Sequence, residues 1–95
     1  MNPNCTILIP TWNRGDYLVR AVKSALAQGE NVREVIVVDN DSSGEYSEYL
    51  QQIADLSNKV RVYIQATNIG PTGNWLTGLK LVKTEWVKIL LVMTF

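Results

Sequence analysis

The strongest constraint on the fold is a segment in which four branched apolar residues, Val35 to Val38, run directly into a cluster of short polar ones. This run is apolar at every position, whereas a strand with one wet face is apolar only at every second position. Such a pattern is typical of a strand covered on both faces, in a parallel sheet with helices on each side. The polar cluster, Asp39 to Ser43, then follows the carboxyl end of the strand, where open α/β sheets bind ligands.

The other periodicities predict alternating strands and helices. Strands are expected at Thr6 to Pro10, Glu34 to Val38, Val60 to Ile64 and Trp86 to Val92. Apolar residues at helical spacing predict helices at Leu18 to Leu26, Tyr46 to Ile53 and Trp75 to Val82. The order βαβαβαβ predicts one α/β domain over residues 1–95, a Rossmann-like, doubly wound, mostly parallel sheet of about four strands and three helices. The strand that begins at Val60 has one face with more polar residues, which indicates a place near the sheet edge.

Composition narrows the chemistry. The 95 residues carry nine basic and nine acidic side chains without a basic cluster, so we expect no nucleic-acid partner. Cys5 is the only cysteine and histidine is absent, which excludes an intrachain disulfide, a cysteine/histidine zinc site and a histidine-based triad. The apolar stretches at both ends are too short for a signal peptide or a membrane span. We therefore expect no transmembrane segment and a cytoplasmic location.

The polar loops after the first three strands are expected to converge, because parallel strands end at the same edge of a sheet. Trp12 offers a flat face for stacking a nucleobase. Asp39, Asn40 and Asp41 can accept hydrogen bonds from a base or from ribose hydroxyls. The alternative is that Asp39 and Ser42 only form a turn, and that Trp12 packs above the first helix.

A diphosphate has two candidate partners. Arg14 can donate charge-assisted hydrogen bonds, and the glycine-containing loop from Gly70 to Asn74 can present backbone N–H groups at a helix start. The alternatives are a solvated surface charge for Arg14 and ordinary turn roles for Gly70 and Gly73. Neither the dinucleotide-binding fingerprint nor the P-loop is present.

Four segments in order resemble the family-2 nucleotide-sugar glycosyltransferases of the GT-A fold: Ile7 to Arg14, Val35 to Ser43, Asn68 to Trp75 and Glu85 to Leu90. The similarity is collinear over nearly the whole chain, and in that family the first two segments hold the nucleotide of a donor, usually of the UDP or dTDP type. The resemblance implies contacts with the base or ribose for Pro10, Thr11, Trp12, Asp39 and Asn40, and an approach to the diphosphate or sugar for Asn74. Trp12 stands where the family more often has tyrosine.

The resemblance stops at Leu90. Complete relatives carry a pair of aspartates there that binds Mg or Mn, but no carboxylate follows Glu85 in this chain. Without that anchor the leaving diphosphate loses its electrostatic stabilisation. We therefore expect no catalytic residue, metal site or cofactor here, only the truncated N-terminal donor-binding half of a GT-A domain. One hypothesis is that loss of a single nucleotide turned a family-like Leu-Phe-Ser-Asp-Asp-Phe into the segment Leu90 to Phe95.

Two functional hypotheses follow. The chain is either the donor-binding half of a glycosyltransferase, or a non-catalytic nucleotide-binding or self-associating remnant, since fold does not fix function. A receiver-like signalling domain is disfavoured, because the third strand runs into Gln65 to Asn68 without a phosphorylatable aspartate. An apolar strand that begins at Trp86 and is not covered would also pair with the same strand of a second copy of the chain, which predicts a homo-oligomer.

Overall fold

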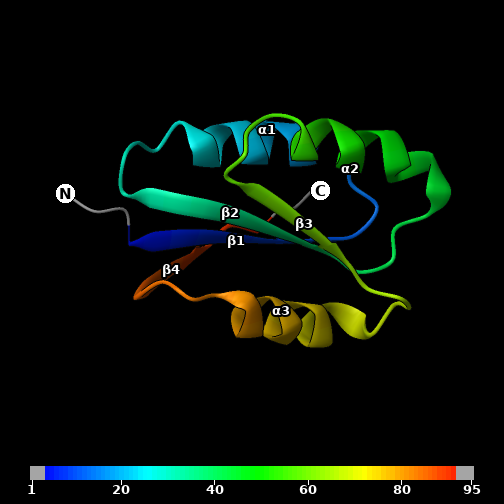
Figure 1. The fold of residues 1–95 in the computed structure, drawn as a ribbon. Coiled ribbons are helices and arrows are strands. Elements are labelled where there is room, and N and C mark those ends of the chain that lie inside the picture. Colours follow the sequence, from blue (N-terminus) through cyan, green and yellow to red (C-terminus); the bar gives the residue numbers. More distant parts are fainter. Residues whose placement is uncertain (1–3, 92–95) are drawn as a thin grey trace.

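The computed structural model describes residues 4–91 and contains four strands and three α-helices in alternation (Figure 1). The strands are β1 (Cys5–Thr11), β2 (Val32–Asp39), β3 (Val60–Ile64) and β4 (Trp86–Ile89). The helices are α1 (Asp16–Leu26), α2 (Ser47–Ala54) and α3 (Gly70–Leu81), with a short 3-10 helix, η1 (Gly44–Tyr46), before α2. The predicted α/β class and order of elements are confirmed.

The four strands form one parallel sheet in the order β3-β2-β1-β4. β1 lies in the centre, with Thr11 opposite Asp39 of β2 and Leu8 opposite Ile89 of β4. β3 is an edge strand, as its wetter face predicted. The carboxyl ends of β1, β2 and β3 therefore meet at one edge, where the polar loops emerge.

Helices cover both faces of the sheet: α1 and α2 lie on one side and α3 on the other (Figure 1). Val35 and Val37 pack in the cluster shared with α1 and α2, whereas Ile36 and Val38 pack with residues of α3. All four side chains are fully buried. The uninterrupted apolar run of β2 thus has the physical cause that the sequence suggested, because neither face of this strand meets water.

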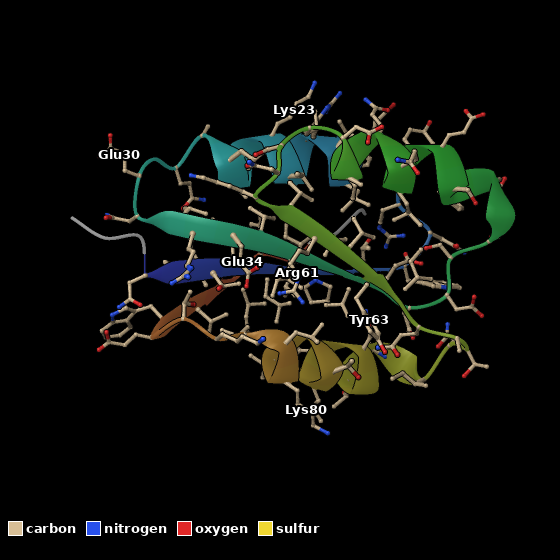
Figure 2. The ribbon with its side chains drawn as sticks, viewed as in Figure 1. Lys23, Glu30, Glu34, Arg61, Tyr63 and Lys80 are labelled. Carbon is tan, nitrogen blue, oxygen red and sulfur yellow. The ribbon has the colours of Figure 1, made fainter. Side chains whose placement is uncertain are left out.

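Most charged residues lie on the outside of these layers, with Asp39 as a buried exception. In Figure 2, Lys23 of α1 and Lys80 of α3 point away from the sheet in opposite directions. Glu34 and Arg61 form an ion pair between β2 and β3, with 3.2 Å between Oε2 and Nη1. Half of the Arg61 side chain is exposed, so this pair adds little to stability.

Helix α3 approaches the sheet closely because of Gly78. A Cβ atom at this position would stand 2.6 Å from both Leu8 Cδ1 and Val38 Cγ2, well inside van der Waals contact. Only a residue without a side chain therefore fits between the helix and the sheet. The close approach brings the first turn of α3 over the carboxyl ends of β1 and β2.

Two element boundaries differ from the sequence prediction by more than two residues. α3 begins at Gly70 rather than Trp75, so the expected loop from Gly70 to Asn74 is its first turn; Pro71 suits that turn because its fixed φ and missing N–H cost nothing there. β4 ends at Ile89, where its pairing with β1 stops, although Leu90 N still donates to Leu8 O at 2.9 Å. Val92, the expected end of the strand, lies outside the described residues.

All four residues of β4 are exposed, and Trp86 keeps 66% of its surface accessible. Within residues 4–91, no strand pairs with the outer edge of β4. The helices described over the same span are all too short or too polar to cross a membrane.

Candidate functional site

A cavity of about 570 Å³ opens at the carboxyl edge of the sheet. Its walls come from the end of β1, the loop after β2, the first turns of α3 and the residue two positions after β4. From β1 the chain adds β2 and then β3 in one direction across the sheet. It then crosses back and places β4 on the opposite side of β1. The cavity therefore lies at the switch point of the topology, where open α/β sheets bind ligands, and its size suits a small molecule.

The cavity brings together six of the nine residues that the sequence singled out: Pro10, Thr11, Trp12, Arg14, Asn40 and Asn74. Asp39, Asp41 and Gly70 are not among its lining residues. Four further residues complete the lining: Asn68, Pro71, Trp75 and Leu91. Asn68, Pro71 and Trp75 belong to a segment that the sequence marked, although the helical spacing of Trp75 indicated only packing for its side chain.

Asp39 has the contacts of a turn former. Its side chain is buried, and its two carboxylate oxygens accept hydrogen bonds from the backbone N–H and the hydroxyl of Ser42. The next residue but one, Asp41, is exposed and has a φ of +62°, which bends the chain so that Ser42 returns to Asp39. These contacts match the turn alternative, and a contact of Asp39 or Asp41 with a ligand stays a prediction.

The loop after β1 is held by the loop after β2. Asn13 N donates to Ser42 Oγ at 2.8 Å, and Asn13 Oδ1 accepts from Ser43 N at 3.0 Å. On the same loop, Arg14 Nη1 donates to the carbonyl oxygens of Trp12 and Asn13, at 3.1 and 3.2 Å. The backbone that carries Trp12 is therefore fixed from two sides.

Asn40 joins the loop after β2 to the segment before α3. Its Nδ2 donates to Asn68 Oδ1 at 3.0 Å, and its Oδ1 accepts from Ile69 N at 2.9 Å. Asn68 Oδ1 also accepts from Gly70 N at 2.9 Å. Both ends of the Asn40 amide are thus used inside the protein, which sets the entry into α3.

Asn74 fastens α3 to the sheet. Its side chain is buried, its Nδ2 donates to Val38 O at 2.8 Å, and its Oδ1 accepts from Gln65 Nε2 at 3.2 Å. The ends of β2 and β3 and the first turn of α3 meet at this one amide. Its approach to a diphosphate or sugar stays a prediction, whereas its structural role follows from these bonds.

The cavity keeps a small set of groups that the protein itself does not use. Among the described residues, two buried side-chain polar atoms have no hydrogen-bond partner, Thr11 Oγ1 and Arg14 Nε, and both belong to residues that line this cavity. Buried polar atoms without partners are rare and call for an explanation such as a ligand. Trp12 and Trp75 add ring surface, with 47% and 38% of each residue exposed. The cavity therefore offers aromatic surface, and two of the residues that line it each carry one unpaired buried polar atom.

These groups do not fit a divalent cation. Mg²⁺ and Mn²⁺ prefer oxygen ligands that include carboxylates, but the ten lining residues contain no aspartate or glutamate and do contain the positive charge of Arg14. Nor do the residues from 4 to 91 bring three potential metal ligands of the carboxylate, cysteine or histidine type together anywhere.

Comparisons with known proteins agree on the kind of protein that this chain resembles. The family model described as "Glycosyl transferase family 2" matches residues 6–90. Over 88 residues, 93% of this chain, the sequence is 33% identical to "Succinoglycan biosynthesis protein ExoO" of Rhizobium meliloti. Over 89 residues, also 93% of the chain, it is 30% identical to "GalNAc(5)-diNAcBac-PP-undecaprenol beta-1,3-glucosyltransferase" of Campylobacter jejuni. The chain spans only 25% and 29% of the lengths of these relatives.

A solved structure shares the fold. "Mannosyltransferase PcManGT from Pyrobaculum calidifontis in complex with GDP-Man and Mn2+" superposes with a TM-score of 0.82 at 20% identity. The match covers 97% of this chain and 28% of that one. The Rossmann-like arrangement of strands and helices described above is therefore that of the GT-A fold.

Proposed function

This chain belongs to glycosyl transferase family 2, and on that premise we propose that its cavity binds the nucleotide of a UDP- or dTDP-sugar donor. The observation that carries the proposal is the cavity at the switch point, which is lined by the half-exposed Trp12 and by two residues that each carry an unpaired buried polar atom. Family membership supports a nucleotide-sugar donor in general. The choice of a pyrimidine base is the finer part of the proposal.

The base is proposed to stack on Trp12. Nearly half of this residue is exposed, and stacking of a base on an aromatic ring contributes about 1–3 kcal/mol. The Thr11 hydroxyl, which is buried and without a partner, would hydrogen-bond the polar edge of the base. Because a hydroxyl can both donate and accept, it suits the alternating N–H and carbonyl groups of uracil or thymine.

The diphosphate is proposed to lie between Arg14 and the start of α3. Arg14 Nε is free to donate to an anion, and a guanidinium forms strong hydrogen bonds with phosphate oxygens. At the start of α3, where Gly70 N already donates to Asn68 Oδ1, the helix dipole favours negative charge.

Sugar transfer is proposed for the complete relatives, and binding without transfer for this chain. The C. jejuni relative is named a glucosyltransferase, and the P. calidifontis structure contains GDP-Man with Mn²⁺. In this chain, the lack of a carboxylate among the lining residues favours the second hypothesis, a nucleotide-binding unit that does not transfer sugar by itself.

Isothermal titration calorimetry of the chain with UDP, dTDP and GDP, with and without Mn²⁺, tests the proposal. We expect binding of UDP or dTDP that does not depend on Mn²⁺. Strong enhancement by Mn²⁺ would contradict the absence of a metal site, tighter binding of GDP would contradict the pyrimidine assignment, and no binding at all would refute the nucleotide assignment.

Trp12→Ala is the decisive variant. Loss of base stacking should raise the dissociation constant for UDP about tenfold or more. Trp86→Ala is the matched control, because Trp86 is even more exposed but lies on β4 and does not line the cavity. An equal effect of the two substitutions would show that Trp12 does not contact the base.

A further inference from the structure

The Ser42 hydroxyl links two loops that are distant in the sequence. It accepts a hydrogen bond from Asn13 N at 2.8 Å and donates one to Asp39 Oδ1. The backbone N–H of Ser42 donates to the other carboxylate oxygen of Asp39 at 2.8 Å. Among the hydrogen bonds of residues 4–91, only those of Ser42 connect the buried Asp39 carboxylate at the end of β2 with the loop after β1.

Backbone conformation indicates that this link holds the loop in a defined shape. Asn13 and Asp41 have φ values of +49° and +62°, in the left-handed region, which asparagine and aspartate adopt more readily than other residues with a Cβ atom. Such conformations persist where surrounding contacts fix them, and they concentrate at functional sites. Here the contacts are the Ser42 bridge and the two hydrogen bonds that Asn13 Oδ1 accepts from the backbone and hydroxyl of Ser43.

Trp12 is the residue that this arrangement orients. It directly precedes Asn13, and its carbonyl oxygen is held by Arg14 Nη1. Trp12 lines the cavity and keeps 47% of its surface exposed, so few contacts of its own side chain fix the ring and its direction depends on the backbone. A contact residue that is ordered before binding avoids an entropy cost when the ligand arrives.

We propose that Ser42 is a positioning residue, which preorganises Trp12 for stacking through its hydrogen bonds to Asn13 and Asp39. The proposal rests on the proposed nucleotide function. Ser42 itself does not line the cavity, so its effect on a ligand has to pass through the loop that carries Trp12.

The first test is a double-mutant cycle with UDP as the probe. Ser42→Ala should raise the dissociation constant about tenfold, equivalent to about 1.4 kcal/mol, and Ser42→Thr, which keeps the hydroxyl, should restore most of the affinity. In a Trp12→Ala background, Ser42→Ala should add less than about a twofold loss, because the ring it positions is gone. An equal loss in both backgrounds would overturn the inference. Ser24→Ala, on the exposed side of α1, is the matched control.

The second test does not need a ligand, so it separates this inference from the proposed function. Amide hydrogen exchange at Asn13 should accelerate about tenfold in Ser42→Ala and return towards the original rate in Ser42→Thr. In Trp75→Phe/Trp86→Phe, where Trp12 is the only tryptophan, Ser42→Ala should increase acrylamide quenching about twofold.

If the original chain binds no nucleotide, the proposed function fails while these two measurements still decide the positioning role. Unchanged exchange at Asn13 and unchanged quenching would overturn it. Should Ser42→Ala not fold, Ser42→Cys, with a weak donor and acceptor of similar size, takes its place and should give intermediate shifts in the same direction.

Discussion

Gly78 sets the distance between α3 and the sheet, and Gly78→Ala is the sharpest test of that geometry. The added methyl carbon would stand 2.6 Å from Leu8 Cδ1 and Val38 Cγ2 and 3.1 Å from Leu8 Cδ2. Ordinary carbon–carbon contacts lie at about 3.5–4.0 Å, so the helix or the two side chains must move by about 1 Å. Because Leu8 and Val38 are fully buried in the sheet, we expect the helix to move.

Two effects of opposite sign decide how much Gly78→Ala changes the free energy of unfolding. Alanine is a better helix former than glycine by about 1 kcal/mol, which favours the substitution. Overpacking of a buried site costs about 1–3 kcal/mol, and displacement of α3 also strains the bond from Asn74 Nδ2 to Val38 O. We therefore expect a net loss of about 1–2 kcal/mol in the free energy of unfolding, and a melting temperature lower by roughly 4–16 °C.

Gly73→Ala is the matched control, with the same substitution in the same helix. Its new methyl carbon would lie 3.2 Å from the side-chain atoms Cδ1 and Cγ1 of Ile69, which is exposed and can give way. Thermal and urea denaturation followed by far-UV circular dichroism should rank Gly73→Ala as equal to or more stable than the original chain. If Gly78→Ala proves as stable as Gly73→Ala, the close approach of α3 does not require glycine and the reasoning is wrong.

Two further predictions concern the hydrogen bonds of Asn74, which join α3 to the sheet, and the outer edge of β4. Asn74→Ala leaves Val38 O and Gln65 Nε2 without their partner, so the free energy of unfolding should fall by about 1–3 kcal/mol. An unchanged free energy of unfolding in a urea titration would refute the structural role of Asn74. Because β4 exposes Trp86, Val87 and Ile89, and no strand within residues 4–91 pairs with its outer edge, the chain should self-associate in sedimentation experiments at high concentration, and Val87→Lys should shift it towards monomer. A strictly monomeric profile of the original chain would contradict the second prediction.

Much of the fold could be predicted because its signals are local. The apolar run from Val35 to Val38 predicted a strand buried on both faces, and the mixed pattern after Val60 predicted an edge strand. The start of α3 was missed, since Gly70 to Asn74 has the composition of a loop. Glycine and proline at a helix start are favourable only when the rest of the helix is in place, and that context is tertiary.

The candidate site was predictable in outline but not in its roles. The cavity lies at the loops that the sequence singled out, and six of the nine predicted residues line it. It did not reveal that the amides of Asn40 and Asn74 bind other parts of the protein on both sides, or that Asp39 is engaged by Ser42. A short polar side chain has the same local preference for loops whether it binds a ligand or a neighbouring backbone group.

The sequence by itself determined the class of fold, the edge of the sheet where the cavity opens and the family, because periodicity and ordered motifs are properties of a linear pattern. The tertiary structure alone decided which polar groups are left for a ligand. Asn13 meets Ser42 across 29 positions, Asn40 meets Asn68 across 28, and Asn74 meets Val38 across 36. Partners so distant in sequence are chosen by the packing of α3 and the loops on the sheet, so no local pattern records them.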